Sequence, residues 1–339
     1  MKKGVKIALI VLLIIILLIT AVFGIGYGYV HSKLNKMQHV ETNPEDIAVT
    51  EGVEQQLEGY RNIAILGIDS REDNYDKGNR SDCIIIASIN NKTKEVKLAS
   101  VYRDTYLEIT GRDLDKVTHA YSYGGPTLTL STLNTNLDLD IKEFVTVNFE
   151  AVEEIVNSIG GIDLQVTAEE VKYMNQYIDE LNKVTSNKAD KITTAGKLHL
   201  NGTQALAYGR IRYTAGGDYK RAERMRTVLM AVVEKAKTLN IGELNKLADE
   251  ILPKVYTNIN TNELISLIPQ MISYKITDSI GWPYKTQGKT INGVWYGPPI
   301  TLESNVKQLH QELFGEDNYV PSDTVKRISN NIIKKTGYQ

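Results

Sequence analysis

Cysteine is almost absent from this chain of 339 residues, because the only one is Cys83, within the apolar run CIIIASI. A single cysteine excludes an intramolecular disulfide framework and a metal site built on cysteine thiolates. Its apolar neighbours predict a buried, unreactive thiol rather than a nucleophile.

An excess of either charge is also missing. Lys and Arg together number 39 and Asp and Glu 41, which gives a formal net charge of -2. A nucleic-acid-binding domain is expected to be basic, so we expect no nucleic-acid partner. The sequence also lacks the GxxxxGK phosphate loop, the HExxH zinc motif and the GxSxG nucleophile motif. Phenylalanine is scarce, with 4 residues against 19 tyrosines, but this imbalance alone indicates no function.

A long apolar stretch is present near the amino terminus. Lys2, Lys3 and Lys6 precede residues 7–30, which carry no charge, and about 20 apolar residues are enough to cross a bilayer. We predict a cytoplasmic stub (1–6), a single transmembrane anchor (7–30) and a polar stalk (31–58), with the rest of the chain outside the cell membrane. A cleaved signal peptide is the alternative, although its apolar region normally spans only about 7 to 15 residues.

Two acids flank a predicted turn between strands. The apolar runs Arg61–Ile68, Cys83–Ile89 and Val96–Val101 predict three strands, the last two forming a hairpin. Asp69 follows the first strand and Asp82 precedes the second. If the loop between them closes a hairpin, both carboxylates lie at one edge of the sheet and could hold Mg²⁺ together with water and phosphate oxygens. Alternatively, both are ordinary turn residues.

The other chemically suggestive positions are arginines. Six cations fall within seventeen residues: Arg210, Arg212, Lys220, Arg221, Arg224 and Arg226. Their density favours a polyanion such as a phosphate ester, because each guanidinium donates two parallel hydrogen bonds. The i, i+2 spacing of Arg210 and Arg212 predicts one face of a strand, and Arg221 and Arg224 would share one face of a helix that starts near Asp218.

Each of these arginine patterns has a simpler explanation. The segment from 210 to 226 could be a solvated hairpin whose cations pair with Asp218 and Glu223. Arg103 and Asp104 follow the third strand, and such neighbours commonly form a surface ion pair.

The rest of the chain alternates strands with helices. We predict helices at Thr127–Leu137, Ala151–Ile159, Gly202–Tyr208 and Asp218–Leu239, strands at Phe144–Asn148 and Asp163–Val166, and a late hairpin within Trp282–Pro299. Interspersed strands and helices predict an α/β sandwich with a central mixed sheet. We place the main domain at residues 59–240 and treat 241–339 as an extension packed on it.

A series of short motifs resembles the LytR-CpsA-Psr family of membrane-anchored cell-wall enzymes. The segments occur in the family's order: LGIDSR, NRSD, SVYRDTYLEI, HAYSYGGPTLT, VNFEAVEEIVNSIGGIDL, LNGTQALAYGRIR and GDYKRAERMR. The resemblance implies an α-β-α fold and a phosphotransferase. Its substrates would be an undecaprenyl-pyrophosphate-linked glycopolymer, such as teichoic acid or capsule, and the 6-hydroxyl of N-acetylmuramic acid in peptidoglycan.

The resemblance also implies roles for individual residues. Asp69 and Asp82 match the acidic pair that holds Mg²⁺, with Mn²⁺ as an alternative, and Asp82 is our preferred general base. The pyrophosphate-binding and catalytic arginines correspond to Arg103, Arg210, Arg212, Arg221 and Arg224, with Asp218 in support. Met225 stands where the family usually has Gln, and Tyr106 and Leu107 stand where many members carry a second arginine.

Two other functions remain open from the sequence. A hydrolase would use the same site with water in place of the sugar hydroxyl. A non-enzymatic membrane regulator would need no phosphate chemistry, and the near-neutral charge and the predicted external location count against it.

Overall fold

The computed structural model describes residues 26–70, 74–184, 188–267, 270 and 273–338, so most of the predicted anchor lies outside the described part. Residues 26–34 are helical. None of the helices in the described ranges combines the length and the apolar character needed to cross a bilayer.

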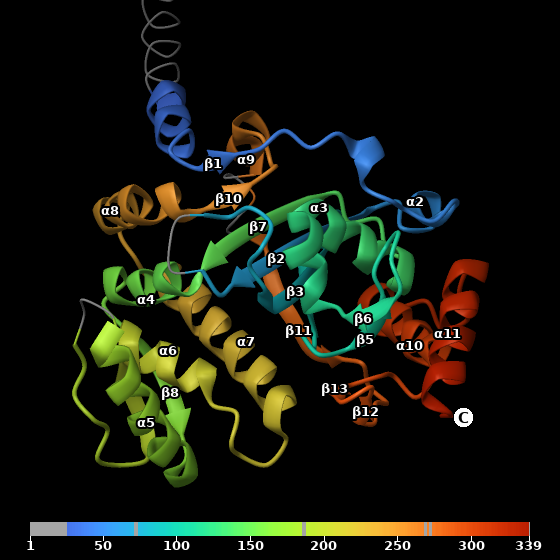
Figure 1. Cartoon of the computed structure of the whole chain (residues 1–339). Helices are drawn as coiled ribbons and strands as arrows, with labels where there is room; N and C mark the ends of the chain where they lie inside the picture. Colours follow the sequence, from blue (N-terminus) through green and yellow to red (C-terminus); the bar gives the residue numbers. More distant parts are fainter. Residues whose placement is uncertain (1–25, 71–73, 185–187, 268–269, 271–272, 339) are drawn as a thin grey trace, which may run out of the picture.

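A seven-stranded mixed sheet forms the centre of the protein (Figure 1), in the order β1-β10-β7-β2-β3-β4-β11. Its strands are β1 (Gln38–His39), β2 (Tyr60–Ile68), β3 (Ser81–Asn90), β4 (Glu95–Val101), β7 (Glu143–Asn148), β10 (Tyr256–Thr257) and β11 (Lys275–Trp282). β2, β3 and β4 pair antiparallel, whereas β7 lies parallel to β2 and β11 parallel to β4. The predicted mixed sheet and the three predicted strands are therefore confirmed.

Three two-stranded sheets and a set of helices complete the fold. The hairpins β5 (Tyr106–Glu108) with β6 (Leu114–Lys116) and β12 (Lys289–Ile291) with β13 (Val294–Tyr296) form two of them, and β8 (Ile162–Val166) pairs with β9 (Gly196–Leu200) in the third, with a helix between them in the chain. The helices are α2 (Val53–Gln56), α3 (Thr118–Leu137), α4 (Phe149–Ser158), α5 (Ala168–Val184), α6 (Gly202–Arg210), α7 (Gly217–Ala236), α8 (Ile241–Ile251), α9 (Thr261–Leu267), α10 (Leu302–Phe314) and α11 (Asp323–Thr336). Short 3-10 helices are η1 (Pro44–Asp46) and η2 (Leu252–Lys254).

Helices cover both faces of the sheet because β3 is apolar on both sides. Ile84 and Ile86 belong to the main core, which includes residues of α3, α10 and α11, whereas Ile85 packs with Leu229 and Met230 of α7. This is the pattern of a central strand buried on both faces. In Figure 1, α7 crosses one side of the sheet while α3, α10 and α11 lie toward the other.

A second core supports the region that carries the arginines. Val156 of α4, Met174 and Ile178 of α5, and Leu206 of α6 pack together with β8 and β9. These elements form the lower left part of Figure 1, and Val228 of α7 joins them. Helix α7 therefore contacts this core on one side and the sheet on the other.

The segments on either side of the expected main domain are built into the same fold. From the predicted stalk, Gln38–His39 supplies the edge strand β1, and Ile47, Val53 and Leu57 are buried in the main core. From the predicted extension, β11 pairs with β4 along its length. Burial of these apolar residues stabilises the packing of both segments on the sheet.

Helix α3 spans Thr118–Leu137 but consists of two helices separated by a kink. At the kink, Gly125 has a φ of 64° and a ψ of -156° and is followed by Pro126. Proline is favoured at the first position of a helix because it has no amide hydrogen to satisfy there. The Gly-Gly-Pro signal therefore marks the start of the second helix, which confirms the predicted helix Thr127–Leu137.

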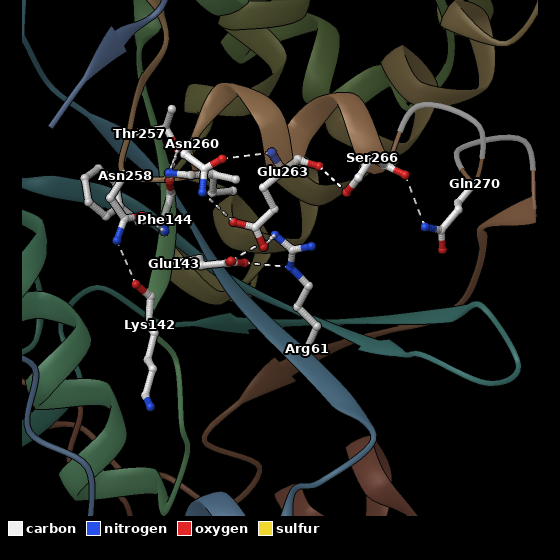
Figure 2. A network of polar contacts seen from close by, with 11 residues as sticks. Arg61, Lys142, Glu143, Phe144, Thr257, Asn258, Asn260, Glu263, Ser266 and Gln270 are labelled. Carbon is white, nitrogen blue, oxygen red and sulfur yellow. Dashed lines mark hydrogen bonds and ion pairs between the residues drawn. The ribbon is translucent and has the colours of Figure 1, made fainter. Parts of the chain in front are cut away.

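A polar network fixes one end of the sheet (Figure 2). Arg61 of β2 donates from Nε and Nη2 to the two carboxylate oxygens of Glu143 of β7, at 2.7 and 2.8 Å, and Nη2 also lies 2.8 Å from Glu263 of α9. Asn258 donates to the carbonyl of Lys142 at 2.7 Å. Burial raises the pKa of Glu143, and the charge of Glu263 raises it further. Arg61 lowers this pKa but does not cancel the rise. The network ties α9 to the end of the sheet opposite the acids Asp69 and Asp82.

Candidate active site

The two acids predicted from the sequence lie together where β2 ends and β3 begins. The strands are antiparallel, and Asp69 donates its backbone N–H to the carbonyl of Arg80 at 3.1 Å. The connecting loop is fastened to α3, since Ser122 Oγ donates to the carbonyl of Asn79 at 2.7 Å. Asp69 is exposed, whereas the Asp82 side chain is only 7% exposed. The predicted hairpin that unites the acids is confirmed.

Asp82 forms ion pairs with three arginines that come from different parts of the chain. Arg103 Nη1 lies 2.6 Å from Oδ1, and Arg221 Nη2 and Arg212 Nη2 lie 3.0 and 3.5 Å from Oδ2. Three guanidinium groups gathered in this way suit an anion with several oxygens.

Arg103 belongs to a chain of charges behind Asp82. Its Nε is 3.4 Å from Asp104 Oδ2, and Lys116 Nζ is 2.7 Å from Asp104 Oδ1. Burial alone would raise the pKa of Asp104, but Lys116 and Arg103 together hold that pKa below its ordinary value of 3.8. Asp104 thus stays ionised and orients Arg103 toward Asp82.

The prediction of a strand carrying Arg210 and Arg212 is wrong. Arg210 is the last residue of α6, and Ile211 ends the helix at φ -59° and ψ 125°. The helix begins with a capping box, in which Asn201 and Gln204 each bond the backbone of the other. Arg212 therefore extends from the loop after the helix, where it reaches Asp82.

Helix α7 begins beside this loop, close to the predicted position. Gly216 precedes it with a φ of 94°, a conformation that suits glycine. Arg221 faces Asp82. Arg224, one turn later, bonds other residues instead. Its Nε donates to Glu170 Oε1 at 2.8 Å, and its Nη2 donates to Thr214 Oγ1 at 2.8 Å. Arg224 thus connects α7 to α5 and to the arginine loop.

The remaining cations of this segment differ from each other. Lys220 is exposed and pairs with Glu223 at 2.8 Å, as a solvated side chain does. Arg226, which the sequence also suggested to be solvated, is only 7% exposed, and its Nε donates to Ser279 Oγ at 2.9 Å. Burial lowers the pKa of its guanidinium. Arg226 therefore fastens α7 to β11. The Asp218 side chain lies outside the described residues.

The acids and arginines surround a cavity of about 230 Å³, lined by Asp69, Asp82, Tyr177, Arg210, Arg212, Tyr213 and Arg221. Beneath α7 lies a narrow cavity of about 10 Å³, which Asp82, Arg103 and Arg221 share with the apolar side chains of Ile84, Val101 and Met225. The charged site therefore adjoins the apolar contact between α7 and the sheet.

Comparison with known proteins identifies the family. The model of the LytR_cpsA_psr family matches residues 25–313. The chain belongs to the LytR-CpsA-Psr family. It is 33% identical over 267 residues to the polyisoprenyl-teichoic acid–peptidoglycan teichoic acid transferase TagU of Enterococcus faecalis, covering 77% of this chain and 80% of the relative. Over 232 residues it is 34% identical to the corresponding transferase TagT of Bacillus subtilis, covering 67% and 69%.

A solved structure supports the same assignment. TagT bound to LIIa-WTA superposes with a TM-score of 0.61 at 27% identity, covering 83% of this chain and 94% of that one. A LytR-CpsA-Psr fold thus accounts for the mixed sheet and for the order of the motifs along it.

Positions where this chain departs from the LytR-CpsA-Psr pattern are filled by packing residues. Tyr106 and Leu107 are 5% and 0% exposed, so the place of a second arginine is part of the core. Met225 packs against α6, where a Cβ on Gly209 would lie 2.5 Å from its sulfur. Cys83 is partly buried, and desolvation raises the pKa of its thiol to about 11, which agrees with the expected unreactive cysteine.

Sequence reasoning missed two residues of the cavity, Tyr177 and Tyr213. Neither belongs to a charged motif. The large number of tyrosines was the only sequence signal that could have drawn attention to them.

The acids offer a partial ligand set for a metal ion. In the described residues, no group of three His, Cys, Asp or Glu side chains could hold one. Mg²⁺ commonly takes only one or two carboxylates and completes its octahedron with water and phosphate oxygens, which fits Asp69 and Asp82. Both oxygens of Asp82 already accept from arginines, so a metal ion would compete with one of these contacts.

Proposed function

We propose that this protein is a membrane-anchored, extracellular phosphotransferase. It moves a glycopolymer from undecaprenyl pyrophosphate to the 6-hydroxyl of N-acetylmuramic acid in peptidoglycan. The observation that carries the proposal is the 230 Å³ cavity in which two acids lie beside Arg210, Arg212 and Arg221. The names of the TagU and TagT relatives support a teichoic acid as the polymer and peptidoglycan as the acceptor.

The arginines bind and orient the reacting phosphates. Arg210, Arg212 and Arg221 line the cavity, so a pyrophosphate there meets several guanidinium groups, while Arg103 holds Asp82 beside it. Such preorganised charge stabilises negative charge that develops on phosphate oxygens during transfer. Asp82 and Asp104 hold Arg103 and Arg221 in place before a substrate binds.

The reaction exchanges one phosphorus–oxygen bond for another. The acceptor hydroxyl attacks the phosphorus that bears the glycopolymer, the bond to the bridging oxygen breaks, and undecaprenyl phosphate leaves. The hydroxyl proton passes to a base, for which Asp82 is our candidate. The products are a glycopolymer joined to peptidoglycan by a phosphodiester and the free lipid phosphate.

Asp69 and Asp82 are the proposed ligands of Mg²⁺, or of Mn²⁺ in its place. A bound divalent ion would neutralise charge on the pyrophosphate and so improve the leaving group. Because Asp69 is exposed, it can bind a metal without losing a partner in the core.

The lipid chain requires an apolar surface next to the phosphates. Helix α7 offers one, since Leu229 and Met230 lie against Ile65, Ile85 and Ile276 of the sheet. The narrow cavity beside Met225 holds only about 10 Å³, so a lipid chain would have to displace part of this packing to enter. The other candidate, helix Thr127–Leu137, is packed more tightly, because Leu130, Leu133 and Leu137 are fully buried in the main core, whereas Leu229 and Met230 are only partly buried. We therefore place the lipid beneath α7.

A transfer assay with purified protein tests the proposal. The protein is mixed with lipid-linked glycopolymer, peptidoglycan strands and Mg²⁺, and polymer bound to the strands is measured. We expect transfer by the wild type and its loss in Asp69→Asn. Undiminished transfer by this variant would contradict the proposed metal site. Free polymer phosphate released in the presence of acceptor would instead identify a hydrolase.

The orientation of the protein in the membrane is tested separately. A reporter fused after Gln339 is expected to be active only outside the cell, because the apolar stretch 7–30 and its preceding lysines direct the chain outward. A cytoplasmic reporter would contradict the extracellular location and favour the regulator.

A further inference from the structure

Two tyrosines, Tyr177 and Tyr213, line the arginine cavity, and a third, Tyr173, contacts Tyr213. Tyr173 and Tyr177 are one turn apart on α5 and so lie on the same side of that helix. Tyr213 directly follows Arg212 in the loop between α6 and α7. The rings of Tyr173 and Tyr213 are 6.0 Å apart and inclined at 36°. Two separate elements thus bring their aromatic rings to one edge of the cavity.

The exposure of Tyr213 sets it apart from the other two. Its side chain is 69% exposed although it lines the cavity, whereas Tyr173 and Tyr177 pack partly against the core of α4, α5 and α6. Burial raises the pKa of Tyr177, and the neighbouring Tyr213 contributes to that rise. The Tyr177 phenol therefore remains a neutral donor beside the arginines.

A neutral aromatic ring beside a phosphate site suits a sugar better than it suits the phosphate. A pyranose ring has an apolar face of C–H groups and a rim of hydroxyls, so it can stack on a tyrosine ring while its hydroxyls bond the phenol. A lipid chain needs an enclosed apolar surface, which an exposed tyrosine flanked by Arg210 and Arg212 does not supply.

We propose that Tyr213 and Tyr177, supported by Tyr173, form a platform that binds a pyranose ring next to the pyrophosphate. This inference rests on the proposed function. In that reaction the phosphorus in the cavity carries the first sugar of the donor and is attacked by a hydroxyl of the acceptor sugar. A pyranose ring therefore lies within two or three bonds of the phosphorus on either side, and the experiment distinguishes the two sources.

The test compares Tyr213→Ala with Tyr213→Phe, which keeps the ring and removes only the hydroxyl. Because Tyr213 is mostly exposed, both variants are expected to fold like the wild type, as circular dichroism can verify. Lys220→Ala is the matched control, since Lys220 is exposed at the start of α7 and contacts Glu223 rather than the cavity.

Binding is measured by titration calorimetry with two lipids in detergent: polyprenyl pyrophosphate without sugar, and the same lipid bearing one N-acetylhexosamine. The KM for peptidoglycan strands is measured in the transfer assay. Loss of a stacked ring is expected to weaken one sugar ligand roughly tenfold. In Tyr213→Ala the sugar-free lipid should bind as it does to the wild type, and Tyr213→Phe should retain most of the affinity.

The binding and kinetic results distinguish a donor sugar from an acceptor sugar. Weaker binding of only the sugar-bearing lipid assigns the platform to the donor, and a raised KM for only the strands assigns it to the acceptor. If Tyr213→Ala binds both lipids and uses the strands like the wild type, the platform is overturned. If the wild type binds neither lipid, the proposed function fails as well, and with it the basis of the platform.

Discussion

Arg224 donates from Nε to Glu170 Oε1 at 2.8 Å, an ion pair in which the two side chains are only 6% and 11% exposed. Arg224 Nη1 also donates to the carbonyl of Ile211 at 3.2 Å, and Nη2 donates to Thr214. The guanidinium therefore holds both ends of the short loop that carries Arg212 and Tyr213. Arg224 acts on the cavity through this loop, as a positioning residue.

Removing Arg224 is expected to destabilise the protein. Arg224→Ala leaves the buried Glu170 carboxylate without its cation, which costs about 3–5 kcal/mol of unfolding free energy when a buried pair is broken. Urea unfolding followed by circular dichroism measures the loss. Lys220→Ala removes an exposed cation from the same helix and should change stability little. Equal stability of the two variants would show that the Arg224 pair contributes no more than a surface pair.

The same pair predicts a pH dependence. Burial would raise the pKa of Glu170, but the backbone N–H of Thr167 and the Arg224 guanidinium outweigh it and hold the pKa below its ordinary value of 4.5. Because the pKa of Glu170 is lower in the folded than in the unfolded protein, its charge contributes its full stabilisation above about pH 4.5. This contribution is lost as the pH falls through the pKa that Glu170 has in the folded protein.

Glu170→Gln provides the comparison. Unfolding free energies of the wild type and variant are measured between pH 3 and 7, and the gap between them should be widest above about pH 4.5 and shrink in acid. A gap that stays constant through the acid range would contradict the role of the Glu170 charge.

The sequence predicted the acids well because their geometry is local. Asp69 and Asp82 flank a single hairpin between two strongly apolar strands, so strand periodicity alone brings them together. The arginines were harder. ALAYGRIRY alternates like a strand, yet the capping box at Asn201 starts a helix that runs to Arg210, and only then does the loop turn Arg212 toward Asp82.

The role of each arginine depends on partners that are distant in the sequence. Arg221 and Arg224 share one helix and one spacing, but Arg221 meets Asp82, 139 positions away, and Arg224 meets Glu170, 54 positions away. Arg226 is buried by its contact with Ser279 of β11. No local pattern encodes these partners, because they are set by how α7 docks between the sheet and α5.

The two acids should respond differently to neutralisation. Asp82→Asn removes the carboxylate that Arg103, Arg212 and Arg221 share, so it should lower both the unfolding free energy and the transfer rate. Asp69→Asn changes an exposed side chain, so it should lower only the rate. Thermal unfolding and the transfer assay on both variants check this contrast. Similar losses of stability would refute the idea that Asp82, unlike Asp69, stabilises the arginine cluster.

Metal removal should reproduce the effect of Asp69→Asn on activity. Chelation by EDTA is expected to stop transfer by the wild type, and added Mg²⁺ or Mn²⁺ should restore it, because two carboxylates cannot bind a divalent ion tightly without phosphate oxygens. In titrations the ion should therefore bind more tightly when polyprenyl pyrophosphate is present. Full activity in excess EDTA would exclude a divalent ion from the reaction.

Arg212 should affect the rate of transfer far more than it affects stability. Its side chain is 38% exposed and lies 3.5 Å from Asp82, so the fold depends on it less than on the buried Arg221. By analogy with arginines that stabilise phosphoryl transfer, Arg212→Ala should lower kcat roughly 10³-fold. Arg212→Lys should recover only part of that loss, because an ammonium cannot donate two parallel hydrogen bonds to a phosphate. Steady-state kinetics of both variants, with Lys220→Ala as the exposed control, separate the two effects. A kcat for Arg212→Ala close to that of Lys220→Ala would remove Arg212 from the catalytic site, and the charge of the cavity would then have to act through Arg210 and Arg221 alone.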